Sequence, residues 1–92
     1  MSASEGPRTA ICPGSYDPVT NGHLDIIGRT TNVFERVIVG VVGNAPRKTD
    51  HLFSAEQRAE FIREATSDLP NVEVEVFRTL LVEFAREKGA TA

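Results

Sequence analysis

The run from Val37 to Val42 is the feature that most constrains the fold of this chain. It reads Val-Ile-Val-Gly-Val-Val, so it is apolar throughout and mostly β-branched. Such residues favour strands, and a strand without polar alternation is covered on both faces. Both faces are covered where helices pack on each side of parallel strands. The run therefore predicts a buried strand in an α/β sheet.

Strand and helix patterns alternate on both sides of this run. The apolar residues of Thr9–Cys12 predict a short, central first strand. From Gly22 to about Phe34 apolar residues recur at helical spacing, which predicts a first helix. Val72–Val76 alternates valine with glutamate, the period of a strand at or near an edge with one solvated face.

Two further helices complete the alternation. Ser54–Gln57 reads Ser-Ala-Glu-Gln, a capping box that starts a second helix at Ser54. Thr79 is predicted to cap a third helix that ends at Gly89, and its apolar face is predicted to hold Leu80, Leu81, Phe84 and Ala85. The order predicts a parallel sheet with flanking helices in a doubly wound α/β layout. Ala90–Ala92 resembles the start of a fourth strand, so we expect the fold to be cut off after its third βα unit.

Size and composition fit one small domain. The chain has 92 residues, of which we expect 1–8 to be a flexible leader and 9–92 to be the domain. The net charge of -3 argues against nucleic-acid and membrane-surface partners, which select basic faces. Cys12 is the one cysteine, which excludes an internal disulfide and fits the cytoplasm. The first eight residues lack the apolar core of a signal peptide or anchor.

The segment from Cys12 to His23 is the candidate site. It joins the first predicted strand to the first predicted helix and carries Pro13, Gly14 and Gly22. A strand, a glycine-bearing loop and a helix in this order direct backbone N–H groups and the positive end of the helix dipole at the loop. An anion is the expected ligand. His23 falls at or just inside the helix start, so its imidazole is expected beside that anion.

Simpler interpretations of these residues remain open. A histidine near a helix start is more often a capping or surface residue than a catalyst. Cys12 is expected to be a small apolar strand residue. Asp17 belongs to a turn dipeptide and Asp25 suits the first helical turn, so neither is assigned to a metal, and the sequence shows no metal-ligand cluster.

The stretch from Pro13 to Ile26 resembles the signature of the nucleotidyltransferase superfamily, in which a T/H-x-G-H motif opens the first helix. Its Thr-Asn-Gly-His form at Thr20–His23 is most similar to the bacterial phosphopantetheine adenylyltransferase family. The resemblance covers nearly the whole chain, with further matching segments at 44–48, 53–58, 69–72 and 80–84. It implies a Rossmann-like nucleotidyltransferase fold. It also implies transfer of AMP from ATP to 4'-phosphopantetheine, giving dephospho-coenzyme A and pyrophosphate.

The resemblance implies a role for each matching residue of the loop. His23 would bind the phosphates and stabilise the transition state. Ser15 would contact both the nucleotide and the substrate phosphate, and Tyr16 would contact the nucleotide through its backbone. Gly14 and Gly22 would permit the close approach of phosphate and adenosine.

On the substrate side, Lys48 matches the family's substrate-binding lysine, with Arg47 as the alternative. Leu81 corresponds to a position that contacts the pantetheine arm, although a core role is equally compatible with its sequence context. Mg²⁺ would arrive with ATP, held by phosphates and water. The resemblance also implies a homo-oligomer, a hexamer in the family.

Two other functions stay open. A nicotinamide mononucleotide adenylyltransferase or a cytidylyltransferase belongs to the same superfamily, but these usually carry His at the Thr20 position. A non-catalytic nucleotide-binding or assembly module is motivated by later family motifs, a Gly-Leu-Arg turn and a Ser-rich helix start, that these 92 residues do not contain.

Overall fold

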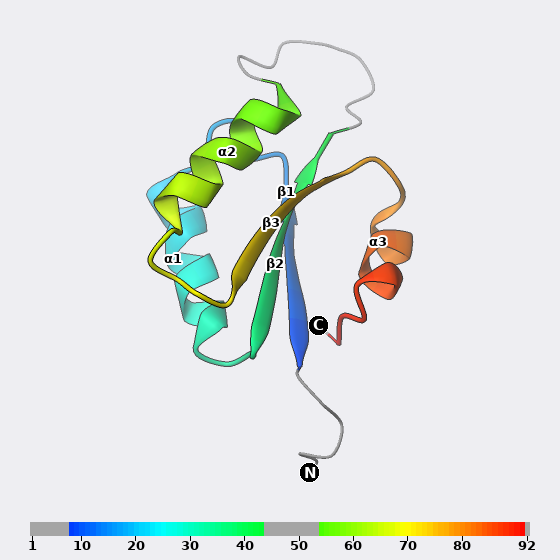
Figure 1. Cartoon of the computed structure of the whole chain (residues 1–92). Coiled ribbons are helices and arrows are strands. Elements are labelled where there is room, and N and C mark those ends of the chain that lie inside the picture. The colour runs from blue at the N-terminus through cyan, green and yellow to red at the C-terminus, as the bar shows by residue number, and fades with distance from the viewer. Residues whose placement is uncertain (1–7, 44–53, 92) are drawn as a thin grey trace.

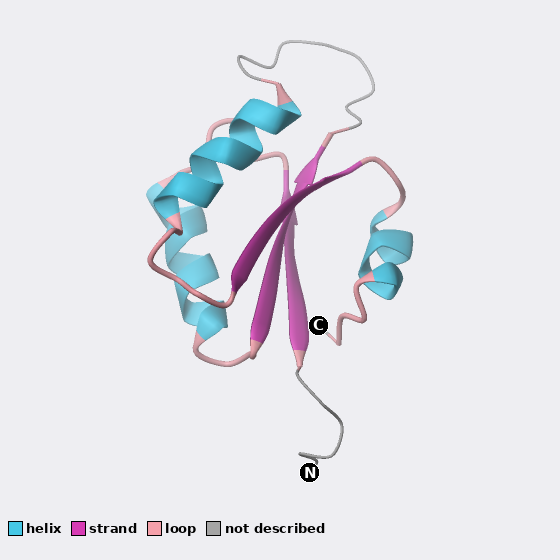
Figure 2. Cartoon of the chain, viewed as in Figure 1, coloured by secondary structure: helices cyan, strands magenta, loops and turns pink. Residues whose placement is uncertain are grey.

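The computed structural model describes residues 8–43 and 54–91. The elements in chain order are β1 (Thr9–Gly14), α1 (Asn21–Thr31), β2 (Arg36–Val42), α2 (Ala55–Ala65), β3 (Val72–Phe77) and α3 (Leu81–Glu87). The strands are all parallel, in the order β1-β2-β3. Figure 2 shows α1 and α2 on one face of this sheet and α3 on the other. The predicted α/β layout is therefore confirmed. Predictions for residues 1–7 and 44–53 lie outside the described residues.

Strand β2 is the middle strand and is buried on both faces. Val37, Ile38, Val39 and Val41 are all 0% exposed. Val39 and Val41 pack in a cluster with residues of α1 and α2, whereas Ile38 packs with Phe77 and Phe84 on the side of α3. The apolar run read from the sequence is thus covered by helices on each side, as predicted.

Strand β1 differs from its prediction in place and length. It is an edge strand of the described sheet, not a central one, and it extends through Gly14. The Arg8 carbonyl accepts from the Arg36 amide of β2, while the Thr9 carbonyl faces the opposite side and accepts from Thr91. Because backbone groups alternate along a strand, Pro13 also faces outward, where its missing N–H costs no ladder bond. The proline therefore does not end the strand.

The chain returns to the outer edge of β1 after α3. The Thr91 amide donates to the Thr9 carbonyl at 2.8 Å, and the Thr91 hydroxyl lies 3.2 Å from the same oxygen. This places residue 91, which was expected to belong to a fourth strand, beside the outer edge of β1.

The start of α3 corrects two predictions. Leu80, not Thr79, is the N-cap residue, and no side chain caps this helix because Leu80 has no polar group. Leu80 and Leu81 are 68% and 44% exposed, so they do not form its buried face. Phe84 alone is buried in α3, and Gly89 ends the helix with a φ of 70°, as predicted.

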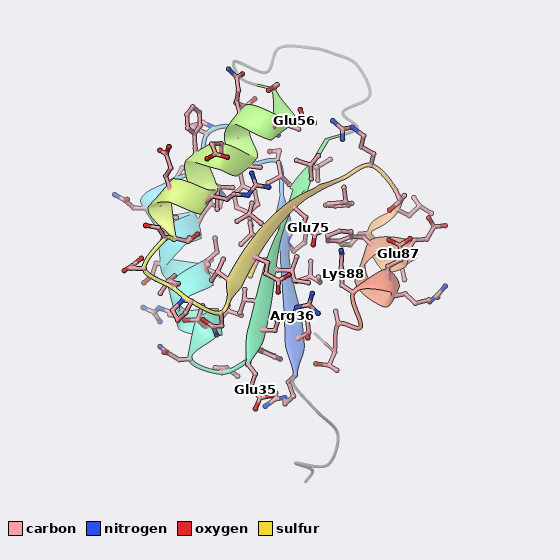
Figure 3. The ribbon with its side chains drawn as sticks, in the orientation of Figure 1. Glu35, Arg36, Glu56, Glu75, Glu87 and Lys88 are labelled. Carbon is pink, nitrogen blue, oxygen red and sulfur yellow. The ribbon has the colours of Figure 1, made fainter. Side chains whose placement is uncertain are left out.

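Helix α3 is attached to the sheet by an aromatic pair and an ion pair. The rings of Phe84 and Phe77 stack with centroids 4.5 Å apart. The Lys88 ammonium lies 2.7 Å from the Glu75 carboxylate of β3, and Figure 3 shows the two side chains meeting between α3 and the sheet. Gly40 of β2 packs closely against these rings. A Cβ at this position would lie 3.0 Å from the Phe84 ring and 3.1 Å from the Phe77 ring.

The ends of α1 and α2 follow from side-chain hydrogen bonds. The predicted capping box of α2 is present, with the Ser54 hydroxyl accepting from the Gln57 amide and the Gln57 side chain accepting from the Ser54 amide. Helix α1 ends at Thr31, earlier than predicted. The Thr31 hydroxyl donates to the Gly28 carbonyl, which the amide of residue 32 would bond in a longer helix, and the Asn32 amide bonds the Arg29 carbonyl instead. In the described part of the chain, no helix has the length and apolar character needed to cross a membrane.

Replacing Gly40 with Ala should detach α3. Two stacked rings and a strand surround the new methyl group, so we expect a loss of about 1–3 kcal/mol in the free energy of unfolding, measured by urea denaturation. Gly28→Ala is the matched control, since a Cβ there has no heavy atom within 4 Å and alanine favours a helix. A Gly40→Ala variant as stable as the wild type would contradict the packing of α3.

Acid should weaken the ion pair that joins Arg36 of β2 to Glu73 of β3. Arg36 donates to both Glu73 carboxylate oxygens at 2.9 and 3.1 Å, and these bonds lower the pKa of Glu73 from its usual 4.5. The stability from this pair is present above about pH 4.5 and is lost as pH falls through the folded-state pKa. Glu73→Gln should therefore reduce the fall in the urea midpoint on acidification, and an unchanged fall would exclude the pair as its source.

Candidate functional site

The candidate site lies at the carboxyl ends of the three parallel strands. β1 ends at Gly14, β2 at Val42 and β3 at Phe77, all at the same edge of the sheet because the strands are parallel. In Figure 1 this edge is at the top, where α2 also begins. In open α/β sheets ligands bind outside the carboxyl ends of the strands. The fold therefore brings the Cys12–His23 loop to the edge that is favoured for binding.

His23 closes a capping box at the start of α1. Thr20 is the N-cap residue, and its hydroxyl accepts from the His23 amide at 3.3 Å. The Thr20 amide donates in return to His23 Nδ1 at 3.0 Å. The imidazole thus occupies the position where Glu or Gln usually completes such a box. The sequence interpretation missed Thr20, although a Thr three residues before a side-chain acceptor was a usable signal.

This box fixes which ring nitrogen of His23 can donate. Since Nδ1 accepts the Thr20 N–H, the neutral ring carries its hydrogen on Nε2. Nε2–H is therefore a hydrogen-bond donor at the N-terminus of an 11-residue helix that has no acidic residue in its first turn. Capping and anion binding are compatible roles for His23, because they use different nitrogens of one ring.

The side chain of Tyr16 packs against the imidazole ring of His23. Its φ of 52° is unusual for a residue other than glycine, and its side chain is buried, 6% exposed, in the cluster between the sheet and the helices. The hydroxyl donates to the Cys12 carbonyl at 2.8 Å. The phenol and imidazole rings meet edge to face, with centroids 4.9 Å apart. With the side chain turned inward, a ligand at the loop would meet the backbone of Tyr16.

The two loop glycines differ in their surroundings. A Cβ on Gly14 would lie 3.0 Å from the Tyr16 ring, so the protein itself requires a glycine there. A Cβ on Gly22 would meet only the Thr20 hydroxyl, at an ordinary 3.6 Å. The fold alone does not explain Gly22, and its predicted role beside a ligand stays a prediction.

Ser15 is exposed on the loop, and its carbonyl is bound by Arg58 of α2. The Arg58 guanidinium donates to this oxygen and lies 3.4 Å from the Val42 carbonyl at the end of β2. Arg58 is only 3% exposed. We did not select Arg58 from the sequence, yet it falls at helical spacing from Ala55 and Ile62, among the buried residues of α2.

The remaining predicted residues lie elsewhere. Leu81 is the first residue of α3, beyond the carboxyl end of β3, and its exposure removes the core alternative. Arg78, in the same connection, pairs with Glu56 of α2 at 2.8 Å. Lys48 and Arg47 lie outside the described residues. The structure thus brings together the loop residues, Gly14 to Tyr16 with Gly22 and His23.

The surroundings of Cys12 and of the acidic residues in this region indicate structural roles. Burial raises the pKa of the half-buried Cys12 thiol, so it is a poor source of thiolate. Asp25 forms an exposed ion pair with Arg29 at 3.0 Å. Within residues 8–43 and 54–91, His, Cys, Asp and Glu form no group of three or more that could hold a metal ion.

Alkaline pH should test the burial of Tyr16. Burial, with a smaller effect of Cys12, raises its pKa from 10.0 to about 12. Stability should therefore fall as pH rises from about 10 to about 12, where the unfolded chain ionises first. As the chain has one tyrosine, phenolate absorbance reports this group alone. Tyr16→Phe should reduce the alkaline fall, to which the Cys12 thiol also contributes, and cost about 1 kcal/mol at neutral pH. A phenolate midpoint near 10 in the native protein would contradict the buried ring.

Comparisons with known proteins agree with this geometry. A phosphopantetheine adenylyltransferase of Nautilia profundicola is 57% identical over 79 residues, which are 86% of this chain and 50% of that protein. A phosphopantetheine adenylyltransferase of Moorella thermoacetica is 51% identical over 85 residues, 92% of this chain and 52% of that protein. The chain spans about half the length of these curated relatives. They confirm the resemblance read from the Thr20–His23 motif.

A solved structure shares the fold of this chain, and a family model matches most of its sequence. The structure is a bifunctional NMN adenylyltransferase/ADP ribose pyrophosphatase from Francisella tularensis, complexed with AMP and a Mn ion. It matches 90% of this chain and 25% of that chain, with a TM-score of 0.66 and 24% identity, which supports the fold alone. A sequence model described as cytidylyltransferase-like matches residues 11–92. This chain therefore belongs to the cytidylyltransferase-like family.

Proposed function

We propose that this chain carries the nucleotide loop of an adenylyltransferase that moves AMP from ATP to 4'-phosphopantetheine, releasing pyrophosphate and forming dephospho-coenzyme A. The observation that carries the proposal is the tautomer of His23, whose Nδ1 accepts from Thr20 and whose Nε2–H can donate to a phosphate. The sequence identity of this chain with the Nautilia and Moorella proteins supports the choice of substrates.

The reaction requires charge stabilisation and positioning more than covalent help. An oxygen of the acceptor phosphate attacks the α-phosphorus of ATP, and the bond from that phosphorus to the pyrophosphate oxygen breaks. His23 Nε2–H would donate to an oxygen that gains negative charge in the transition state. The N-terminus of α1 adds the positive end of its dipole. Ser15 would bind through its hydroxyl, and Tyr16 through its backbone.

The acceptor side of the proposal rests on Lys48 and Leu81. Lys48, or Arg47 in its place, would neutralise phosphate charge during transfer. Leu81 would lie along the pantetheine arm, and its exposure is compatible with that contact. Mg²⁺ would enter as the complex with ATP, bound by phosphate oxygens and water. Residues 9–92 would act as one domain, and the hexamer and the cytoplasmic location stay predictions.

Gly22→Ala should separate a ligand role from a folding role. Because the new Cβ has room in the protein, the thermal midpoint should stay within about 2 °C of the wild type. ATP affinity, measured by calorimetry, should fall at least about tenfold, the equivalent of one blocked contact. Gly28→Ala, on the same helix and away from the loop, should leave affinity unchanged. Equal ATP affinity in both variants would remove Gly22 from the site.

Pyrophosphate release with a panel of acceptors tests the activity itself. With ATP and Mg²⁺, 4'-phosphopantetheine should support release, whereas nicotinamide mononucleotide should not. His23→Ala should lower the rate by about 10²–10³-fold, as expected for loss of one donor to developing charge. Release with nicotinamide mononucleotide, or with CTP in place of ATP, would select a related transferase. ATP binding without release by this chain would support the non-catalytic nucleotide-binding alternative.

A further inference from the structure

Arg58 occupies a position where a charged side chain is costly. It lies in the second turn of α2, 3% exposed, on the face that also holds Ala59 and Ile62. Arginine is seldom buried this deeply, because removing its charge from water costs several kcal/mol unless hydrogen bonds compensate. A hydrophobic residue would fill this position at lower cost, so the contacts that Arg58 makes need an explanation.

Those contacts join two separate loops. The guanidinium donates to the Ser15 carbonyl, in the loop between β1 and α1, and lies 3.4 Å from the Val42 carbonyl, the last residue of β2. Both oxygens lie at or just beyond strand ends, where the sheet ladder stops fixing the backbone. A planar guanidinium has donors in fixed directions, so two carbonyls bound to it are held at a set separation.

One of the two bound residues leads directly into the proposed site. Ser15 precedes Tyr16, whose ring contacts the imidazole of His23. Val42 is the last residue of β2, the central strand of the described sheet. We infer that Arg58 is a positioning residue that sets the nucleotide loop relative to the end of β2. The inference rests on the proposed function, but its geometric part concerns the loop alone.

Arg63 of the same helix offers a matched control. Its guanidinium also donates to a backbone carbonyl, that of Val74 in β3, at 3.0 Å. It also pairs with Glu60 at 3.1 Å. Val74 lies in the middle of its strand, away from the carboxyl edge. Arg58 and Arg63 thus share a helix, a side-chain type and a kind of hydrogen bond. They differ in burial, since Arg58 is 3% exposed and the Arg63 side chain is 49% exposed, and in whether the bound carbonyl belongs to the site.

The experiment compares Arg58→Lys with Arg63→Lys in the full chain. Both carbonyls contact Nη1, whose two N–H groups point in fixed directions in the guanidinium plane. Lysine keeps the charge, but the N–H groups of its ammonium rotate and do not fix the two carbonyls relative to each other. We expect Arg58→Lys to lower ATP affinity, or kcat for pyrophosphate release, by about 10- to 100-fold at a temperature where both variants are folded. Arg63→Lys should change these values less than about twofold, whatever its effect on the thermal midpoint.

Three outcomes decide the inference. If Arg58→Lys lowers only the thermal midpoint and leaves ATP affinity and kcat unchanged, Arg58 has a purely structural role and the inference is overturned. If the wild type binds ATP without turnover, the ATP affinities of the two variants decide alone: a loss in Arg58→Lys only supports the inference, and an unchanged affinity overturns it. If the wild type binds no ATP, the proposed function fails, and hydrogen exchange of the 15–23 amides decides: faster exchange in Arg58→Lys alone supports positioning, and equal exchange in both variants overturns it.

Discussion

The arrangement of the candidate site depends on the buried guanidinium of Arg58. It joins α2 to the loop after β1 and to the end of β2. Two residues earlier, Glu56 of the same helix pairs with Arg78, in the connection after β3. The first two turns of α2 are therefore bonded to the carboxyl ends of all three strands. Hydrogen bonds to charged groups stabilise by about 1.5–3 kcal/mol each, which offsets part of the cost of burying the charge.

A second chain of contacts runs within the loop and ends at His23. The absence of a side chain at Gly14 leaves room for the inward ring of Tyr16, and that ring meets the imidazole edge to face. Thr20 then fixes the tautomer of the imidazole from the other side. One buried tyrosine and one capping threonine together set the direction and the protonated nitrogen of a histidine. In the proposed function, this orientation would allow a residue of the helix cap also to donate a hydrogen bond to a phosphate.

Local patterns in the sequence predicted most of the fold, because they depend on neighbouring residues. The Val37–Val42 run and the Ser54 capping box are such patterns. Pro13 was misjudged, because whether a proline ends a strand depends on the side of the sheet that it faces. Thr79 has a suitable side chain for a cap, but the helix begins one residue later. Arg58 was missed because its partners are 43 and 16 residues away in the chain.

A titration of the wild-type chain with ATP, followed through its backbone amide resonances, tests the central claim most directly. The claim is that the carboxyl edge of the sheet, between the β1–α1 loop and the start of α2, binds a nucleotide. The account predicts that shifts concentrate in residues 15–23 and at Gly43, while Glu35 and Asn71, at the opposite edge, stay unchanged. Shifts centred on that opposite edge, or no shifts at saturating ATP, would contradict it.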